Sequence, residues 1–438
     1  MVGAGRSGVF SARLLLREGA GVLVVDERSK DAVEKSLGEP IPEGVFFRQG
    51  LMLPSDVCRT SLVVLSPGVP RERLPLPELA EAGVPVLGEL ELGFCRFQGK
   101  VAAITGTNGK STVTTLVGGM ASRAFGRVFV GGNLGTPFVE AAGEPFDWGV
   151  VEVSSFQLES IDKFRPKVAA LLNLTEDHRD RYAGFDAYAE AKMPVFRNMD
   201  SGDAAVVNAD DPEVMERTAH VRARRIPFSV RRELPVGGFL AGSDMVYRSA
   251  SGDERYPVKG MKIKGLQNVE NALAAICVAR SMEVSPESVL AELAEFPGLP
   301  HRVEFVRAVR GVSFFNDSKG TNVGAVLAAL EGFPEPVVLV AGGKDKGVDF
   351  RPLREPLSRK ARTLVLFGEA RTRMEGELCG TVPIVLADTL PGAVQAAAKA
   401  ACHGDVVVFS PACSSYDMFR NFEERGDAFR CAVKELPE

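Results

Sequence analysis

The sequence predicts three parallel α/β domains in series. Three segments of the chain each open with a short apolar run, typical of a strand, that is followed by glycines. Further apolar runs alternate with helical stretches, a pattern typical of parallel sheets with helices on both faces. The length of 438 residues agrees with this prediction, because one domain usually holds about 100–200 residues.

Residues 1–92 are predicted to form a Rossmann-like domain. The helical stretch Val9–Arg17 is followed by two apolar runs, Gly21–Asp26 and Ser61–Ser66. Ahead of the helix, Gly3-Ala-Gly5-Arg-Ser-Gly8 has the GxGxxG pattern, which taken alone favours a dinucleotide but is a weak motif. Only two residues precede these glycines, where a strand of about five residues is expected. Either the first strand is truncated or the natural chain starts upstream.

Residues 93–298 are predicted to form a P-loop ATPase-like domain around a parallel sheet. Buried strands are expected at 148–153 and 168–173, where apolar residues dominate. The stretch Phe228–Val258 is rich in β-branched residues and glycines, which favours a small antiparallel excursion.

Residues 299–438 are predicted to form a second Rossmann-like domain. The Pro297–Pro300 cluster ahead of it is typical of a linker. Apolar runs at 336–341, 363–367 and 405–410 are its expected strands. In open α/β sheets ligands bind at the carboxyl ends of the strands, so functional residues are expected there.

The composition excludes several classes of protein. A net charge of −5 argues against a nucleic-acid partner, which usually selects a basic patch. No apolar run reaches the ~18 residues that indicate a membrane span, so no membrane insertion is expected. The seven cysteines are scattered without a CxxC pair, which predicts reduced thiols in the cytoplasm and no zinc site. Small anionic substrates remain compatible with this composition.

The strongest motif is a phosphate-binding loop at 104–112. It lies between an apolar run and a helical stretch, so its glycines can turn backbone amides toward phosphates at a helix N-terminus. Lys110 can reach the β- and γ-phosphates, and the Ser111 hydroxyl suits Mg²⁺. The first glycine of the GxxxxGK[ST] pattern is replaced by Ile104, and an ATPase, a GTPase or a kinase would all fit. ATP contacts are predicted at Gly106, Thr107, Asn108, Gly109, Lys110, Ser111 and Thr112.

Side chains that can bind metals follow two of the expected strands. Glu152 lies just past one strand, where a Mg²⁺ ligand or a water-holding group often lies. His178 lies in Asn173–Tyr182, which crowds Asn, Glu, Asp and His into one turn. Fourteen residues further on, Lys192 is expected in a helix at Ala187–Met193. Taken alone, Glu152 is equally compatible with a solvated strand end, whereas a loop histidine such as His178 and a helical lysine such as Lys192 are more often ordinary surface residues.

Together with several later blocks, these motifs resemble the Mur ligases. The phosphate loop and a His-Arg pair are shared with folylpolyglutamate synthases, whereas the blocks that begin at Val153, Asp317 and Ser410 look like the branch that adds D-glutamate. The blocks lie in the family's order from residue 3 to about 426: Gly106–Thr112, Glu152-Val-Ser-Ser-Phe-Gln-Leu-Glu159, Asn173–Tyr182, Asn268–Ala275, His301-Arg302, Asn316-Asp-Ser-Lys-Gly-Thr-Asn322, Gly342–Gly347 and Ser410–Phe422.

The resemblance implies ATP, two Mg²⁺ ions and a lysine carbamate formed with CO₂. The implied catalytic residues are Lys110, Glu152, His178 and Lys192. The implied metal ligands are Ser111, Glu152, His178 and the carbamate on Lys192. Further nucleotide contacts are implied at Asn271, Arg302 and Asp317, the last at the ribose. The family usually has histidine where this sequence has Gln267, which leaves the role of the neighbouring Asn268 open.

The resemblance also implies the substrate contacts. The glycine turn of the first domain would cradle a uridine diphosphate rather than a dinucleotide, with contacts from Arg6, Ser7, Asp26, Ser66, Gly68, Asn133 and His178. The incoming D-glutamate would be held by residues of the third domain, namely Lys319, Thr321, Lys346, Ser415 and Phe422.

The implied activity is ATP-dependent addition of D-glutamate to UDP-N-acetylmuramoyl-L-alanine through an acyl phosphate. This reaction belongs to peptidoglycan synthesis, and with it to cell shape and division, and we expect a cytoplasmic monomer. Alternatives are another Mur ligase or a folylpolyglutamate synthase-like ligase, which differ in substrate. An NAD-binding regulator or dehydrogenase with a P-loop domain would instead change nicotinamide absorbance without releasing phosphate. A non-enzymatic nucleotide switch would leave the later blocks without a role.

Overall fold

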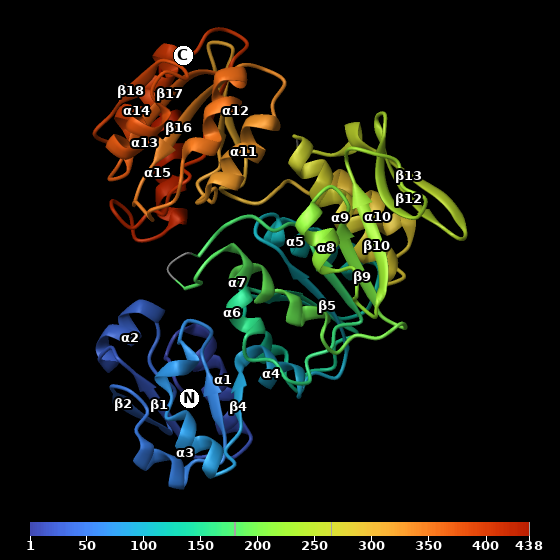
Figure 1. Cartoon of the computed structure of the whole chain (residues 1–438), viewed down its shortest axis with the longest axis vertical. Helices are drawn as coiled ribbons and strands as arrows, with labels where there is room; N and C mark the ends of the chain where they lie inside the picture. The colour runs from blue at the N-terminus through green and yellow to red at the C-terminus, as the bar shows by residue number, and fades with distance from the viewer. Residues whose placement is uncertain (179–180, 264, 438) are drawn as a thin grey trace.

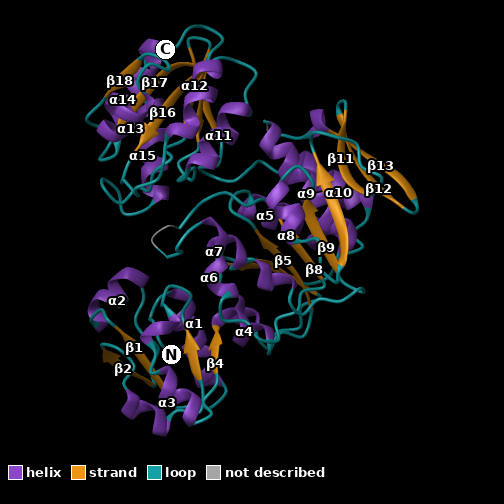
Figure 2. Ribbon diagram, viewed as in Figure 1, coloured by secondary structure: helices purple, strands orange, loops and turns teal. Residues whose placement is uncertain are grey.

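The computed structural model describes residues 1–178, 181–263 and 265–437 and contains three α/β units that follow one another along the chain. The N-terminal unit lies at one end of the molecule and the C-terminal unit at the other (Figure 1). In each unit, helices pack around strands (Figure 2). The predicted fold class is therefore confirmed.

The N-terminal unit has four parallel strands. β1 pairs with β2, β3 pairs with β4, and Val2 bridges β1 and β3. The glycine turn after Val2 is tight, because a Cβ atom on Gly8 would lie 2.1 Å from the carbonyl oxygen of Gly3. The elements are β1 (Val22–Asp26), β2 (Val45–Gln49), β3 (Val63–Leu65), β4 (Val86–Gly88), α1 (Arg6–Arg17), α2 (Lys30–Leu37) and α3 (Leu76–Glu81).

The first strand is reduced to a bridge. Val2 donates a hydrogen bond to Val64 O (2.9 Å), and Val25 donates one to Met1 O (3.0 Å), so these two residues pair with both neighbours. Beyond Met1, a groove of about 830 Å³ continues between β1 and β3. The Met1 amine donates to Leu23 O (2.8 Å). Because the N–H and C=O of a strand residue point to the same side, the N–H of Leu23 also faces this groove.

The central unit is built on a nine-stranded sheet in the order β13-β12-β11-β10-β9-β8-β5-β7-β6. Alternate residues of β5 enter two hydrophobic clusters, Ala102 and Ile104 in one, Val101 and Ala103 in the other, so both faces of the sheet are buried. Its strands are β5 (Lys100–Thr105), β6 (Val128–Gly132), β7 (Trp148–Glu152), β8 (Val168–Leu171), β9 (Ala204–Asn208), β10 (Arg224–Ser229), β11 (Gly237–Ala241), β12 (Asp244–Ser249) and β13 (Gly252–Pro257).

Two helices pack against each other beside this sheet, α5 (Lys110–Ala124) and α9 (Leu266–Ser281). The predicted excursion is antiparallel, since β12 pairs antiparallel with β11 and with β13, and it extends the central sheet. The remaining helices of the unit are α6 (Ser155–Leu158), α7 (Phe185–Glu190), α8 (Pro212–Arg217) and α10 (Pro286–Glu295), with 3-10 helices η3 (Phe138–Ala141) and η4 (Met193–Phe196).

The C-terminal unit has a six-stranded sheet in the order β14-β15-β19-β16-β17-β18, in which only β14 runs antiparallel to its neighbour. Its elements are β14 (Glu304–Val309), β15 (Val312–Asn316), β16 (Val337–Gly342), β17 (Ala361–Phe367), β18 (Ile384–Leu386), β19 (Val406–Phe409), α11 (Val323–Glu331), α12 (Arg354–Lys360), α13 (Arg371–Leu378), α14 (Leu390–Ala400) and α15 (Phe422–Lys434).

The units are joined by a helix and a loop. The boundary expected after residue 92 falls inside α4 (Glu89–Phe94), which contacts both β4 and η3. The boundary expected after residue 298 falls between α10 and β14. Within the described ranges, none of the helices combines the length and the apolar character needed to cross a membrane.

We predict that a short segment rich in valine and isoleucine, joined in front of Met1, stabilises the N-terminal unit. It would pair with β1 and β3 and fill the groove between them. A net gain of about 1 kcal/mol would raise the unfolding midpoint by about 2–4 °C. Differential scanning calorimetry measures this shift. A glycine-serine segment of equal length is the control, and equal midpoints for both proteins would contradict the prediction.

Candidate active site

The phosphate-binding loop joins the end of β5 to the start of α5. Gly109 has a φ of 83°, and a Cβ atom there would lie 2.3 Å from Asn271 Oδ1, so the loop packs directly against α9. The Lys110 ammonium donates to the carbonyl oxygens of Gly106 (3.0 Å) and Thr107 (2.9 Å). The lysine therefore lies folded over its own loop, within reach of any phosphate that the loop holds.

A chain of hydrogen bonds links the loop to the end of β7. Ser111 Oγ lies 2.6 Å from Glu152 Oε2, and Asn133 Nδ2 donates to Glu152 Oε1 at 2.7 Å. Parallel pairing of β5 with β7 and of β6 with β7 brings the three residues together, because all three lie at the carboxyl ends of these strands. The predicted pair Ser111 and Glu152 thus forms one buried polar site.

The C-terminal unit reaches this site with two basic side chains. Arg302 donates from Nη2 to Ser111 Oγ at 2.6 Å. Lys319 lies with its ammonium 3.9 Å from the centroid of the Phe422 ring. Burial, followed by the nearby Arg302 charge, lowers the pKa of Lys319 to about 8. Charges from two units therefore converge on one hydroxyl.

Lys192 is buried, with 2% of its surface exposed, and its ammonium lies 4.6 Å from the centroid of the Tyr188 ring. The expected helix at Ala187–Met193 is wrong in extent: α7 ends at Glu190, and Lys192 lies in the turn before η4. Burial, followed by the charge of Lys110, lowers the pKa of Lys192 well below its usual value. Burial therefore shifts the equilibrium of this lysine toward the neutral amine.

His178 lies on the same side of the central unit but is exposed. Its φ is 52°, in the left-handed region that histidine adopts more often than most residues. Its ring centroid lies 4.9 Å from that of Phe156 and 6.0 Å from that of Tyr188. The neighbouring residues 179 and 180 of the predicted block lie outside the described residues.

A pocket of about 230 Å³ adjoins the phosphate loop on the side of the C-terminal unit. Asp317 lies in it, accepts a hydrogen bond from Ser410 Oγ at 2.8 Å and is buried. Burial raises the pKa of Asp317 to about 7, against the opposing effect of the Ser410 hydrogen bond. Among the residues predicted to contact the nucleotide, those that line this pocket are Asn108, Gly109, Thr112, Asn271, Arg302 and Asp317.

A larger cleft of about 900 Å³ lies where the three units meet. The predicted residues that line it are Arg6, Ser7, Ser66, Gly68, Ser111, Asn133, Glu152, Arg302, Lys319 and Phe422. Gln157 also lines it, although the sequence analysis gave this residue no role within its block. The predicted residues outside both linings are Asp26, Gly106, Thr107, Lys110, His178, Lys192, Thr321, Lys346 and Ser415.

The carboxylate of Asp26 is bound to the glycine turn of its own unit. Its carboxylate accepts a hydrogen bond from Ala4 N (2.7 Å) in the glycine turn and pairs with Arg28 at 2.9 Å. Together with the Ala4 bond, this pairing outweighs the effect of burial and lowers the pKa of Asp26 to about 2. Asp26 therefore stabilises the turn that places Arg6 and Ser7 in the cleft.

Arg425, which the sequence did not mark as functional, connects the loops that carry Thr321 and Ser415 through hydrogen bonds. Arg425 is fully buried and donates to Ser318 O (2.8 Å) and to Ser414 O (2.9 Å). Lys346 Nζ lies 3.4 Å from Thr321 O, which brings these two predicted residues together. No sequence pattern marks an arginine in a helix as a buried link between loops.

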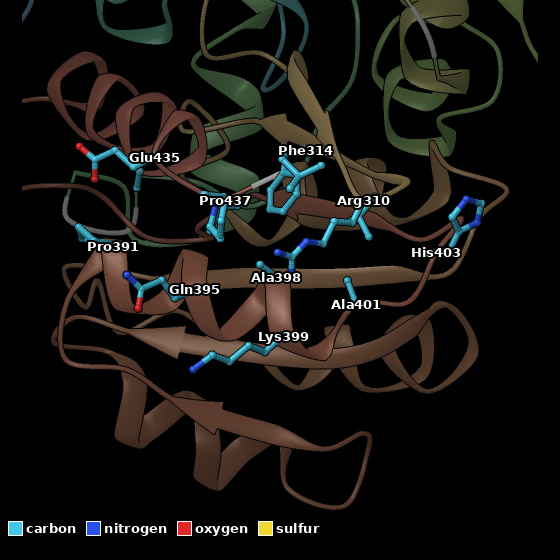
Figure 3. A pocket seen from close by; sticks show the side chains of 14 residues that line it. Arg310, Phe314, Pro391, Gln395, Ala398, Lys399, Ala401, His403, Glu435 and Pro437 are labelled. Carbon is cyan, nitrogen blue, oxygen red and sulfur yellow. The ribbon is translucent and has the colours of Figure 1, made fainter.

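A separate cavity of about 600 Å³ lies within the C-terminal unit (Figure 3). Val312 and Phe314 line it, near the start of β15, whereas Asp317 follows the end of that strand. Arg310, Lys399, His403 and Glu435 also contribute to its lining. None of the predicted site residues borders this cavity.

The donor set at the loop suits Mg²⁺, because this ion prefers oxygen ligands and is often held by one hydroxyl and one carboxylate beside phosphates. Ser111 and Glu152 supply such oxygens from adjacent strand ends. Among the described residues, no group of three or more His, Cys, Asp and Glu side chains gathers as an all-protein metal site.

The sequence matches known families along almost its whole length. Residues 1–88 match the Mur ligase MurD-like N-terminal domain, 104–279 the Mur ligase middle domain, and 301–413 the Mur ligase glutamate ligase domain. The chain belongs to the Mur ligase family. Its relatives include a UDP-N-acetylmuramoylalanine–D-glutamate ligase of Syntrophotalea carbinolica, 45% identical over 100% of this chain and 97% of the relative. A protein of the same name from Geotalea uraniireducens is 43% identical with the same coverage.

Solved structures of other Mur ligases share the fold. The pseudomurein peptide ligase type C of Methanothermus fervidus has a TM-score of 0.65 at 17% identity and covers 100% of this chain and 99% of its own. The UDP-N-acetylmuramate-alanine ligase MurC of Thermotoga maritima has a TM-score of 0.60 at 20% identity and covers 99% and 98%. The three-unit architecture is therefore that of the Mur ligases.

We predict that Asp317 makes nucleotide affinity depend on pH near 7. If its carboxylate accepts a ribose hydroxyl, protonation below its pKa of about 7 replaces a charged acceptor by a weaker neutral one. ADP should therefore bind about five- to tenfold more weakly at pH 6 than at pH 8. Titration calorimetry across this range measures the effect. Asp317→Asn is the control, because the pH dependence that remains in this variant comes from other groups, such as the phosphates of ADP. An equal pH dependence of ADP binding in both proteins would exclude this role of Asp317.

Proposed function

We propose that this Mur ligase uses ATP to join D-glutamate to UDP-N-acetylmuramoyl-L-alanine in the synthesis of peptidoglycan precursors. The observation that carries the proposal is the cleft where the three units meet, with Ser111 of the phosphate loop in its lining. The glycine turn lies on one side of the cleft, and Lys319 and Phe422 lie on the other. The relatives at 40–45% identity that are named for this reaction support it.

The first step is an attack by the alanyl carboxylate on the γ-phosphorus of ATP. The carboxylate oxygen bonds to phosphorus, ADP leaves, and an acyl phosphate forms. Both reactants are anions, so their charge must be balanced before they can meet. Lys110 and Arg302 both lie at the phosphate loop. Their positive charges are suited to hold the phosphates and to stabilise the negative charge that develops during phosphoryl transfer.

Mg²⁺ would be held at Ser111 and Glu152, where it would neutralise phosphate charge when bound. Asn133 fixes the carboxylate of Glu152 through its 2.7 Å hydrogen bond and so orients the oxygen that faces Ser111. In this structure the guanidinium of Arg302 donates a hydrogen bond to the Ser111 hydroxyl. It must turn toward the phosphates when the nucleotide binds.

Lys192 is suited to carbamylation, because CO₂ reacts with a neutral amine. Burial already favours that form. The amine nitrogen bonds to the carbon of CO₂ and loses a proton to water, which turns a neutral side chain into an anion. The carbamate attracts Lys110, whose charge repels a protonated Lys192, and it gives the cluster a second carboxylate beside Glu152.

The second step brings the D-glutamate amine to the acyl carbonyl, and phosphate leaves as the amide bond forms. Lys319 and Lys346 offer positive charge to the two carboxylates of D-glutamate, with Thr321, Ser415 and Phe422 on the neighbouring loops. Since these residues come from the C-terminal unit, that unit delivers the second substrate while the central unit activates the first. The resulting cleft keeps water from the acyl phosphate.

The reaction is proposed to take place in the cytoplasm, with ATP as its energy source. All seven cysteines lie in the described part of the chain and are free, which suits a reducing compartment. We expect the protein to act as a monomer.

The function is tested by phosphate release from ATP in the presence of UDP-N-acetylmuramoyl-L-alanine. Release should require D-glutamate and should not occur with L-alanine, L-lysine or buffer. Mass spectrometry should show a product heavier by one glutamyl residue. Release with a different amino acid would keep the mechanism and reassign the substrate, and the absence of release with every amino acid would contradict the proposal.

We predict that Lys110→Ala lowers kcat by at least about a thousandfold, because a preorganised charge at the transferred phosphate is lost. Steady-state kinetics measure this loss. Lys100→Ala removes a lysine at the far end of β5 and is the control, since its ammonium packs over Trp148 (5.5 Å). Unchanged turnover in Lys110→Ala would remove the loop from the mechanism.

We also predict that Lys192→Ala loses most activity and that short carboxylic acids such as acetate partly restore it. The added acid would bind in the space that the Lys192 side chain leaves, where its carboxylate would replace the negative charge of the carbamate. Activity is measured with and without acid, with Lys167→Ala, an ion-paired surface lysine, as the control. Full activity of Lys192→Ala without acid would exclude the carbamate.

A further inference from the structure

The junction between the N-terminal and central units is tightly packed. α4 begins directly after β4, and Gly88 N donates a hydrogen bond to Ser160 O at 3.1 Å. A Cβ atom on Gly88 would lie 2.9 Å from the Ser160 Cβ atom. The first turn of α4 therefore has one fixed position relative to the central unit.

Glu89, the first residue of α4, is a fully buried carboxylate at this junction. It accepts a hydrogen bond from Val139 N at 2.8 Å and one from Gln157 Nε2 at 3.4 Å. The backbone amide of Phe138 also donates to it. Among the described residues, no basic side chain pairs with Glu89. Its partners are therefore neutral donors that need an acceptor.

These donors belong to the two segments that form the floor of the substrate cleft. The side-chain oxygen of Gln157 accepts from Ser154 N and from Ser154 Oγ, both at 3.0 Å, and this bond caps α6 just after Glu152. Phe138 and Val139 begin η3, which follows the loop that carries Asn133. Asn133 and Gln157 both line the cleft.

We propose that Glu89 is a positioning residue for the nucleotide-sugar substrate. Glu89 lies in α4, which joins the N-terminal unit to the central unit, and it holds the carboxamide of Gln157 and the backbone that follows the Asn133 loop. These contacts set the distance between the cleft residues of the central unit and the glycine turn of the N-terminal unit. The proposal rests on the proposed function, because a substrate that spans both units is what needs this alignment. The pocket proposed for ATP is lined by the central and C-terminal units, so ATP binding would not depend on this alignment.

A carboxylate suits this position for a physical reason. It only accepts hydrogen bonds, and every group that faces it is a donor. Burial raises the pKa of Glu89 to about 7, and the bonds from Val139 and Gln157 oppose that rise. A glutamine here would turn one NH₂ group toward another, and Gln157 would have to rotate and release Ser154.

Glu91 provides a matched control two residues further along α4. It is equally buried, with 1% of its surface exposed, and it accepts three backbone hydrogen bonds: Asp162 N (2.9 Å), Lys163 N (2.8 Å) and Phe164 N (3.0 Å). None of these residues lines the cleft. Glu91→Gln therefore disturbs the same helix to a similar extent without touching the floor of the cleft.

The test compares Glu89→Gln and Glu91→Gln in the full chain by steady-state kinetics and calorimetry. Both variants should lower the unfolding midpoint. Only Glu89→Gln should raise KM for UDP-N-acetylmuramoyl-L-alanine, by about tenfold, with KM for ATP unchanged. Equal KM changes in the two variants, or a parallel rise for both substrates, would reduce Glu89 to a structural residue and overturn the proposal.

A second variant covers the case in which Glu89→Gln does not fold. Glu89→Asp keeps the carboxylate but is one methylene too short to reach both Val139 and Gln157, so it should fold and still raise KM for the nucleotide-sugar. An unchanged KM in Glu89→Asp would overturn the proposal. If the unaltered protein shows no turnover that depends on D-glutamate, the proposed function fails instead, and the two failures are thus distinguished.

Discussion

Buried positive charge around one carboxylate is the constraint on which the site depends. Glu152 raises the pKa of each basic group near it, yet burial lowers the pKa values of Lys110, Lys192, Arg302 and Lys319 overall. Asp177 acts in the same direction on Lys110 and Lys192, and Asp317 on Arg302, but burial outweighs these acids as well. Such a cluster of buried basic groups is unfavourable in a poorly solvated site unless a further anion joins it. A polyphosphate is such an anion, and a carbamate on Lys192 would be another. The basic side chains are therefore in place before the ligands bind, and their burial lowers the free energy of unfolding of the unliganded protein.

The three-unit architecture follows from the same constraint. The central sheet fixes Glu152 at the end of β7, and Ser111 at the start of α5 and Asn133 just after β6 are both hydrogen-bonded to its carboxylate. The N-terminal unit is coupled to this frame through α4 and its two buried glutamates. The C-terminal unit contributes Arg302 across the interface to the Ser111 hydroxyl. One unit can thus hold the nucleotide-sugar and another can bring the amino acid, while the charge that activates the first substrate stays in the rigid middle.

Much of this arrangement could be predicted from the sequence, because strand runs and the phosphate loop are local patterns. The fold class and the meeting of Ser111 with Glu152 follow from strand ends that share one edge of a sheet. Local patterns could not give the direction in which individual side chains point, because that direction depends on tertiary packing. Asp26 stabilises the glycine turn rather than lining the cleft, and Lys192 lies in a turn after α7. Arg425 and Glu89 had no visible signal, because their burial arises only from tertiary packing.

The central claim is that the nucleotide-sugar carboxylate attacks ATP before the amino acid reacts. It is tested most directly by labelling that carboxylate with ¹⁸O and analysing the released phosphate by mass spectrometry. An acyl phosphate intermediate passes one carboxylate oxygen to phosphorus, so the phosphate should carry one ¹⁸O atom for each amide bond formed. Unlabelled phosphate accompanied by normal amide formation would mean that the carboxylate never bonds to phosphorus, which would contradict the mechanism.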